Sequence, residues 1–422
     1  MGINVTTTDQ VSFTEGELLA TDDYVEPLVV GGVECHGGFT DEGTYVSPRT
    51  RNRMPAIAAW QAKHRRDFGT ELLEAPLDTW PEHYPSVDQA RFLVASGVPE
   101  PIISTLTRIG TVEGFGGMIR HAPVPDVQCL VDEDVAGTAL AHLDQGLFEA
   151  HARDEAGFEG QAGHKHMWFA ARDVAFEDPV TEDETQLMLE RMGIVPPGAG
   201  GKVDPAAIRA AAAAVRLWPD DVSLDLEMLV TRMTRLVMIE VSAFHTFAWA
   251  EELLADTDLL AGDGEAARLV SYIRADETPH VGYLRTALSE LRDRTIVGSS
   301  GRKYAGSDLV GQVWDAALTA STTTNRALML ETTWREVRHA VGERPGAADL
   351  LARFDELGTV HRSADGAWVE AAAESAASAL CPAALPDGRA RRGRGRAGAG
   401  PRRRAAQAMN VRPERASSTV PP

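Results

Sequence analysis

The sequence predicts an all-α protein whose central part is a bundle built from two helical hairpins. Hydrophobic residues make up 44 % of the 422 residues and aromatic residues only 6 %, and stretches rich in Ala and Leu recur, a composition that favours helices. From about residue 91 onward, apolar residues recur at intervals of three and four, which gives a helix one apolar face. Two segments also resemble each other, and each carries a Glu within an apolar stretch.

The chain divides into four regions on this pattern. Residues 1–90 are rich in Gly, Pro, Thr and acidic residues, with one helix expected near RMPAIAAWQAKHRRDF, and should form an N-terminal extension. Residues 91–300 should form the bundle, and residues 301–385 should add C-terminal helices. Residues 386–422 include GRARRGRGRAGAGPRRR, which has too few apolar residues to offset the entropy of ordering, so a disordered basic tail is expected.

The helices expected in the bundle follow from the same periodicity. A break is expected at VPPGAGGKVDP, residues 195–205, before an Ala-rich helix. Pro279 lies inside one expected helix, where it indicates a local widening. The expected long helical segments cover residues 86–97, 99–115, 137–158, 224–256, 265–295 and 308–341.

Composition excludes several classes of protein. The three cysteines are far apart and form no CxxC pair, so neither a disulfide framework nor a thiolate zinc site is expected. No secretory signal and no long apolar segment occurs, so a soluble, cytoplasmic protein without membrane contact is expected. Residues 389–422 contain ten Arg and one Glu, a net charge of +9, so the rest of the chain must carry −30 to give the total of −21. This acidity makes it unsuited to specific nucleic-acid binding.

An internal repeat is the strongest signal. TRIGTVE, residues 107–113, and TRLVMIE, residues 234–240, share Thr, Arg and a final Glu. An Asp-Glu pair follows each of them, in RDEAGF at 153–158 and in ADETPH at 275–280. The two halves therefore look like copies of one helical hairpin.

The repeat predicts where four carboxylates meet. If each hairpin folds back at its turn, Glu113 comes level with Glu155, and Glu240 comes level with Glu277. Four carboxylates inside an apolar bundle are tolerable only if something compensates their charge, and a pair of divalent metal ions does so. His280 lies on the same helix face as Glu277, because residues three apart are neighbours on a helix.

Glu on one helix and Glu-x-x-His on the next, given twice, resembles the pattern of the ferritin-like di-iron carboxylate proteins. That superfamily includes ribonucleotide reductase small subunits, soluble methane monooxygenase, acyl-carrier-protein desaturases and arylamine N-oxygenases, and the resemblance covers roughly residues 95–295. It implies a ferritin-like four-helix bundle with two iron ions and O2 as co-substrate. The iron ligands that it implies are Glu113, Glu155, Glu240, Glu277 and His280.

One position departs from the pattern, because Phe158 stands where the first half should carry its histidine. His151, one turn before Glu155, resembles the additional histidine of the N-oxygenases and is the substitute that we favour. His245 could take part only through a π-bulge, since it would otherwise face away from Glu240. The alternatives to His151 are Glu159, His164, His166 and His245.

Other motifs have simpler interpretations. Glu336 and His339 form a second Glu-x-x-His, which we interpret as an ordinary surface pair. Met167 and Trp168 are expected in the core, and Cys35 with His36 in a loop. No sequence typical of a nucleotide-binding site or of a serine hydrolase occurs.

These observations lead to an O2-dependent di-iron oxidoreductase that hydroxylates, desaturates or N-oxygenates a small organic substrate with electrons from an external donor. The catalytic residues beyond the ligands are unknown, and a homodimer is left open. One alternative is a ferroxidase-type or non-catalytic metal-binding bundle. The other is a haem-oxygenase-like di-iron oxidase, in which Asp276 would replace Glu277 as a ligand.

Overall fold

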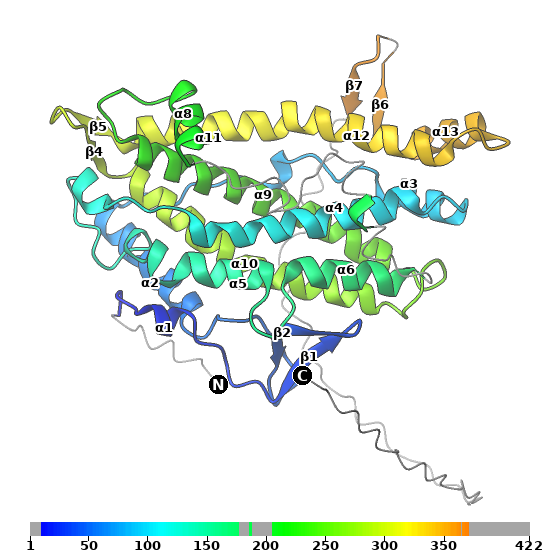
Figure 1. Cartoon of the computed structure of the whole chain (residues 1–422), viewed down its shortest axis with the longest axis horizontal. Coiled ribbons are helices and arrows are strands. Elements are labelled where there is room, and N and C mark those ends of the chain that lie inside the picture. The colour runs from blue at the N-terminus through cyan, green and yellow to red at the C-terminus, as the bar shows by residue number, and fades with distance from the viewer. Residues whose placement is uncertain (1–9, 177–184, 188–204, 364, 371–422) are drawn as a thin grey trace, which may run out of the picture. The chain divides into compact units, whose positions relative to one another are not determined.

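The computed structural model describes residues 10–176, 185–187, 205–363 and 365–370. These residues fold mainly into α-helices, as predicted, and all of them belong to one unit, Met1–Glu374 (Figure 1). The predicted basic tail, residues 386–422, lies outside the described residues. So does the predicted break at 195–205, except for residue 205.

The N-terminal region contains a small sheet in addition to the predicted helix. The antiparallel sheet has the order β1-β2-β3; its strand β2 packs against α6 (His164–Ala175), and Cys35 forms an isolated β-bridge with Ala162, in the loop before that helix. Cys35 and His36 therefore lie in a strand and not in the predicted loop, because Gly31 and Gly32 form a tight turn that pairs the two apolar runs around them. The elements are α1 (Glu15–Leu18), β1 (Glu26–Val30), β2 (Val33–Phe39), β3 (Tyr45–Val46) and α2 (Arg53–Phe68).

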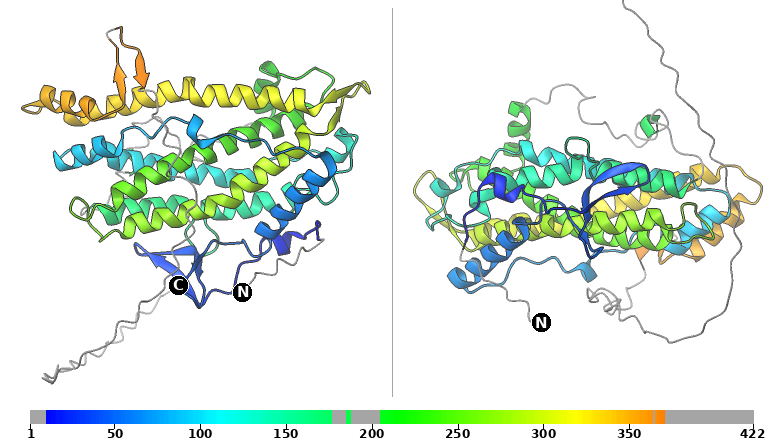
Figure 2. Two further views of the ribbon diagram at one scale, coloured as in Figure 1. Left: turned by 180° about the vertical axis from the view of Figure 1, so that it is seen from behind. Right: turned by 90° about the horizontal axis from the view of Figure 1, so that it is seen from below.

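Two groups of helices form the centre of the unit (Figures 1 and 2). In the first, α4 packs on α5 and α6; in the second, α9 packs on α10; α6 and α10 join the two groups. Ser86 begins α3 with a capping box, and Ser223 caps α9. The helices are α3 (Val87–Ala95), α4 (Glu100–Gly116), α5 (Phe148–Ala156), α6 (His164–Ala175), α8 (Pro205–Ala214), α9 (Leu224–Leu254) and α10 (Glu265–Arg292).

The expected helix over residues 137–158 is shorter than predicted. Only α5 is a regular helix there, since the chain before it forms a 3₁₀ turn (Leu140–His142) and a π turn (Leu143–Leu147). Gly146 has a φ of 117°, which no helix accommodates, and it packs against Leu18 of α1. In contrast, α10 continues as an α-helix through Pro279, without the predicted widening.

The C-terminal part adds helices and two hairpins. In Figures 1 and 2, α11 and α12 run along one side of the central helices, where α11 packs on α9 and α10, and α12 packs on α4. These elements are β4 (Thr295–Val297), β5 (Lys303–Ala305), α11 (Gly306–Thr322), α12 (Thr324–Val341), α13 (Ala347–Glu356), β6 (Val360–Arg362) and β7 (Trp368–Glu370).

The buried apolar residues form two cores, and the long helices pass through both. On α9, the buried apolar residues up to Val241 belong to the first core, and those from Phe247 onward belong to the second. On α10 the order is reversed: residues up to Ile273 belong to the second core, and those from Tyr283 onward belong to the first. Met167 and Trp168 lie in the second core, as predicted. On α10 the buried side chains of Asp276, Glu277 and His280 lie between the two cores, and on α9 the buried Glu240 lies beside Val241, where the first core ends.

One further buried acid holds the irregular segment before α5. The carboxylate of Glu290, in the last turn of α10, accepts hydrogen bonds from the backbone N–H groups of Ala139 (3.1 Å) and Leu140 (3.0 Å). Burial raises the pKa of Glu290 to about 7, although these donors oppose the shift.

Among the helices of the part described here, none combines the length and the apolar composition that crossing a membrane would require.

Candidate metal centre

Six side chains singled out from the sequence meet between the two apolar cores. Glu113 comes from α4, His151 and Glu155 from α5, Glu240 from α9, and Glu277 and His280 from α10. Five of the six are buried, and the sixth, Glu113, has 11 % of its side chain exposed. The structure thus brings together every residue that the repeat and the resemblance pointed to.

Two overlapping groups of ligand atoms lie at this point. The first group consists of Glu113, Glu155, His164 and Glu277, and the second of His151, Glu155, Glu240 and His280. Within each group, the ligand atoms all lie within 4.8 Å of one another.

Glu155 and Glu277 connect the two groups, because each carboxylate reaches both His164 and His280. The two oxygens of Glu277 lie 2.8 Å from His164 Nδ1 and 2.6 Å from His280 Nδ1. Those of Glu155 lie 3.4 Å and 3.5 Å from the same two nitrogens. Each carboxylate therefore lies within reach of both groups, whereas Glu113 lies beside His164 and Glu240 beside His151.

His164, which the sequence offered only as an alternative, occupies the place of the missing histidine. The helix α5 ends at Ala156, and α6 begins at His164, so the loop 157–163 returns the chain to Glu155. Gly157 has a φ of 83°, and Gly163 lies so close to the backbone of Gly157 and Glu155 that a Cβ atom there would overlap with it. Two glycines in GFEGQAGH were the signal for this close return.

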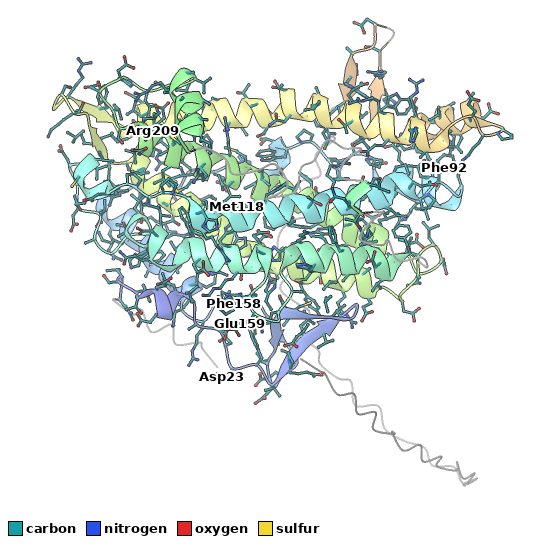
Figure 3. All side chains as sticks on the ribbon, in the orientation of Figure 1. Asp23, Phe92, Met118, Phe158, Glu159 and Arg209 are labelled. Atoms are coloured by element: carbon teal, nitrogen blue, oxygen red, sulfur yellow. The ribbon has the colours of Figure 1, made fainter. Side chains whose placement is uncertain are left out.

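The remaining alternatives are elsewhere. Phe158 stacks against the guanidinium of Arg153 at 3.6 Å in the loop, and Glu159 beside it is exposed (Figure 3). His166 is exposed, and His245 hydrogen-bonds with the backbone carbonyl of Leu77 (2.9 Å), which draws it away from Glu240.

The second Glu-x-x-His pair is not part of the centre. Glu336 forms an ion pair with Arg108 (2.8 Å), and His339 is exposed.

The aspartate that precedes each central glutamate contacts the histidine of the other helix group. Asp154 Oδ2 lies 3.0 Å from His280 Nε2, and Asp276 Oδ2 lies 3.4 Å from His164 Nε2. In both cases the other ring nitrogen faces the glutamates, so each aspartate fixes the orientation of an imidazole from behind. The repeated Asp-Glu pair was visible in the sequence, but its crossed arrangement was not.

The N-terminal region supports the two aspartates differently. Arg49 and Arg53 each approach Asp154 at 2.7 Å, and they hold the pKa of that carboxyl well below its usual range even though burial opposes them. Asp276 instead accepts a hydrogen bond from Tyr45 (2.5 Å) and lies 2.8 Å from His36 Nε2. Sequence reasoning identified none of these four supporting residues.

Burial dominates the electrostatics of the carboxylates, because it favours their neutral form. It raises the pKa of Glu113 and of Glu240 well above the ordinary value, and the charges of Glu155 and Glu277 add to the shift. Burial also acts on Glu277, but the two histidines beside it outweigh burial and hold its pKa well below the ordinary value.

The pKa values of the three histidines at the centre shift in different directions. Burial opposes the protonation of His164 and His280, yet their carboxylate neighbours outweigh it and raise the pKa of His164 well above the ordinary value and that of His280 to about 9. Burial, helped by His280, lowers the pKa of His151 well below the ordinary value. His151 is therefore neutral, the form in which imidazole binds a metal.

Several buried atoms at the centre have no hydrogen-bond partner among the described residues. They point to a bound cation, because an unpaired buried polar atom is costly and native structures rarely keep one. Carboxylate and imidazole ligands together suit iron, manganese or zinc. The atoms are Glu155 Oε2, Glu277 Oε1, His151 Nε2 and His164 Nδ1.

A third group of metal-binding residue types, His36, His164 and Asp276, fits a supporting role better than an ion site. His36 Nδ1 is already engaged with the carbonyl of Ala162 (2.7 Å), and both Asp276 oxygens have partners.

Comparison of the chain with family models, with curated proteins and with solved structures found no match to any of them.

Proposed function

We propose that this protein is an O2-dependent di-iron oxidoreductase with a ferritin-like central bundle that acts on a small organic molecule. The observation that carries the proposal is the pair of carboxylates, Glu155 and Glu277, each of which reaches both His164 and His280. Glu113 and Glu240 would each complete one end of a dinuclear site, and His151 would add a neutral ligand beside Glu240. Two Fe(II) ions bound there would supply the electrons for O2 reduction.

The chain's own residues support such chemistry in three ways. Glu155 and Glu277 would each hold both ions, and carboxylate oxygens are hard, anionic ligands that suit iron. Asp154 and Asp276 hold the two imidazoles in place, and the apolar cores on either side keep bulk water from the ligands.

A route for the substrate is favoured on the side of α4 and α9. Glu113 is the one member of the glutamate quartet whose side chain is more than 10 % exposed. Val112 and Ile239, which directly precede Glu113 and Glu240, are 40 % and 49 % exposed. Apolar side chains beside the two terminal ligands suit a substrate with a hydrophobic body.

Two observations weigh against the alternatives. The histidine missing at position 158 was the main argument for an impaired, non-catalytic metal site. His164, 3.4 Å from Glu155, offers an imidazole in its place and so weakens that argument. A haem-oxygenase-like site would use Asp276 as a ligand, but Asp276 lies behind His164 and is engaged by Tyr45 and His36.

Anaerobic loading with Fe(II), followed by metal analysis, Mössbauer spectroscopy and exposure to O2, tests the proposal. We expect two coupled iron ions per chain, lost in Glu277→Ala and retained in the matched control Glu336→Gln. One iron ion or none per chain would overturn the dinuclear site, and loss of iron in Asp276→Ala with retention in Glu277→Ala would favour the haem-oxygenase-like arrangement.

Oxygen consumption separates catalysis from storage. Consumption that rises when a small organic molecule is added would support an oxygenase. Consumption that stops after the bound Fe(II) is oxidised, whatever is added, would favour a ferroxidase.

A further inference from the structure

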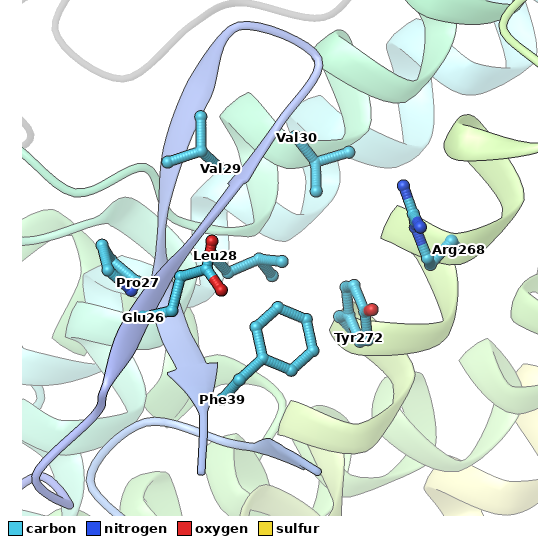
Figure 4. Close-up of a pocket in the computed structure, with 8 residues that line it drawn as sticks. All are labelled: Glu26, Pro27, Leu28, Val29, Val30, Phe39, Arg268 and Tyr272. Carbon is cyan, nitrogen blue, oxygen red and sulfur yellow. The ribbon is translucent and has the colours of Figure 1, made fainter. Parts of the chain in front are cut away.

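A groove between β1 and α10 shares no residue with the candidate metal centre. It has a volume of about 340 Å³, a size that suits a small organic molecule. One wall is the strand β1, and the other consists of Arg268 and Tyr272 of α10 together with Phe39 at the end of β2 (Figure 4). The groove is therefore a second place at which this protein could hold a ligand.

The apolar lining of the groove is already in position. Leu28 and Val30 alternate along β1 on the same face, and they are only 2 % and 3 % exposed. Phe39 packs edge-on against the ring of Tyr272, with 5.9 Å between the centroids. Tyr272 in turn stacks on Tyr45, with 4.3 Å between the centroids. Because these rings hold one another, little conformational entropy would be lost when a ligand binds.

Arg268 is the cation of the groove, and its guanidinium group is largely free. The side chain is 58 % exposed, and the acid that pairs with it, Glu265 on the same helix, lies 3.8 Å away and is itself exposed. Within the described ranges, Arg268 has no other ion pair. A long, exposed pair of this kind contributes little, so the guanidinium group is available to an anion from outside.

The hydroxyl group of Tyr272 adds a second donor beside this cation. Arg268 and Tyr272 are four residues apart on α10 and are therefore neighbours on one helix face. Burial raises the pKa of Tyr272, although the charge of Arg268 opposes the shift, so the phenol is protonated at neutral pH. This hydroxyl has no hydrogen-bond partner in the part of the chain that the structure describes.

Glu26 places a negative charge at the other end of the groove. Glu26 and Val30 are the two ends of β1, and Figure 4 shows Arg268 on the side of Val30. Four steps along a strand cover about 13 Å. No ion pair joins Glu26 to Arg268 among the described residues. A carboxylate is thus attracted to one end of the groove and repelled from the other.

We propose that this groove binds a small amphipathic monocarboxylate. The carboxylate accepts hydrogen bonds from the guanidinium group of Arg268 and the hydroxyl group of Tyr272. The apolar body lies along Leu28 and Phe39, and Glu26 disfavours a second acidic group at the far end. The site goes beyond the proposed function, because none of these interactions involves the metal centre.

An extended peptide suits the groove less well. As an outer strand of its sheet, β1 could in principle pair with an added strand. Pro27 lacks a backbone N–H, however, and a proline in an outer strand removes a donor from the edge that an added strand would need. A small molecule depends on no backbone pairing, so Pro27 does not weaken its binding.

Titration of the full-length protein with octanoate, isotope-labelled at its carboxyl carbon and followed by nuclear magnetic resonance, tests the site. Octanamide, which is neutral, and octanedioate, which has a second carboxylate, are added as competitors. The variants are Arg268→Gln and Tyr272→Phe. The matched control is Arg274→Gln, because Arg274 is an exposed arginine on the same helix that pairs with Glu251 and does not line the groove.

We expect saturable binding of octanoate to the wild-type protein. Binding should weaken about tenfold or more in Arg268→Gln and about threefold or more in Tyr272→Phe, because hydrogen bonds that involve a charged group are the stronger ones. Arg274→Gln should bind octanoate as the wild-type protein does. Octanamide and octanedioate should each compete about fivefold less well than octanoate, or worse.

Equal binding of octanoate by the wild-type protein and Arg268→Gln would overturn the proposal, as would the absence of saturable binding to the wild-type protein. Octanamide that competes as well as octanoate would refute the preference for a carboxylate, and octanedioate that does so would refute the role of Glu26. Stronger competition by a capped pentapeptide of alternating valine and threonine would place a peptide in the groove instead. None of these measurements requires iron, so their failure leaves the proposed function standing.

Discussion

The Nδ1 atom of His164 lies 3.4 Å from Glu155 although a break in the helix separates the two residues. In one continuous helix the two residues would lie far apart, because positions nine residues apart are not on neighbouring turns. The close return of the loop 157–163 supplies the imidazole that the spacing of the first half lacks.

Substitutions test whether position 164 or position 158 supplies the imidazole of the first ligand group. His164→Ala should remove the ion held by Glu113 and leave about one iron ion per chain, because the second group of ligands keeps both its histidines. Phe158→His in that background should not restore it, since residue 158 stacks on Arg153 in the loop. Metal analysis checks both; restoration by Phe158→His would contradict the assignment of His164.

The return of the loop depends on Gly163. Gly163→Ala should destabilise the protein by about 1–3 kcal/mol or more and lower its metal content, because the new methyl group meets backbone atoms that cannot move aside. Gly160→Ala is a matched control in the same loop, with open space around the added atom. Thermal denaturation and metal analysis of the two variants should differ clearly; equal behaviour would refute the role of the tight return.

Asp154 compensates two buried cations. Asp154→Asn should cost about 3–5 kcal/mol, because it leaves the guanidinium groups of Arg49 and Arg53 buried without a counter-charge. Asp67→Asn, at a partly exposed pair with Lys63, should cost less than about 1 kcal/mol. Denaturant unfolding of metal-free protein measures both costs, and similar values for the two would contradict this account.

The carboxylate quartet should weaken the fold when no metal is bound. Glu240→Gln should stabilise the metal-free protein at neutral pH by roughly 1–3 kcal/mol, since burial and the nearby carboxylates raise the pKa of Glu240 and the folded state must take up a proton there, which glutamine does not require. The same variant should lose the stabilisation that iron gives the wild-type protein. Unfolding curves with and without Fe(II) test the two effects; a less stable metal-free variant would count against the prediction.

The pKa of Glu290 gives a pH dependence with a definite sign. Because its folded-state pKa of about 7 lies above the unfolded value of 4.5, the folded state binds more protons between these values. The contribution of Glu290 is therefore present at low pH and falls as pH rises through about 7, by as much as about 3 kcal/mol. Glu290→Gln should lack this slope, which denaturation at several pH values would show; an identical slope would refute it.

Much of the helical framework could be predicted from the sequence, because local patterns determine it. The expected segments at 99–115, 224–256 and 265–295 correspond closely to α4, α9 and α10. The four glutamates were recognisable because each lies in an apolar stretch and the stretches repeat. Such signals depend on residues a few positions apart, which a single sequence shows directly.

The supporting residues could not be found in this way. His36, Tyr45, Arg49 and Arg53 meet their aspartates over more than a hundred residues of sequence. No periodicity connects such partners. The strand that carries His36 did have a local signal, since two Gly residues separate two apolar runs, a pattern typical of a tight hairpin.

The support of Asp154 and Asp276 by the N-terminal region has a consequence for how the protein is made. Ribosomes synthesise residues 36–53 early, whereas Asp276 and His280 emerge much later. Arg49 and Arg53 can meet Asp154 early, whereas His36 and Tyr45 lack their partner Asp276 until most of the polypeptide has been translated. A chain truncated before Asp276 should accordingly lack both the support of His36 and Tyr45 and the ligands Glu277 and His280 of the proposed centre.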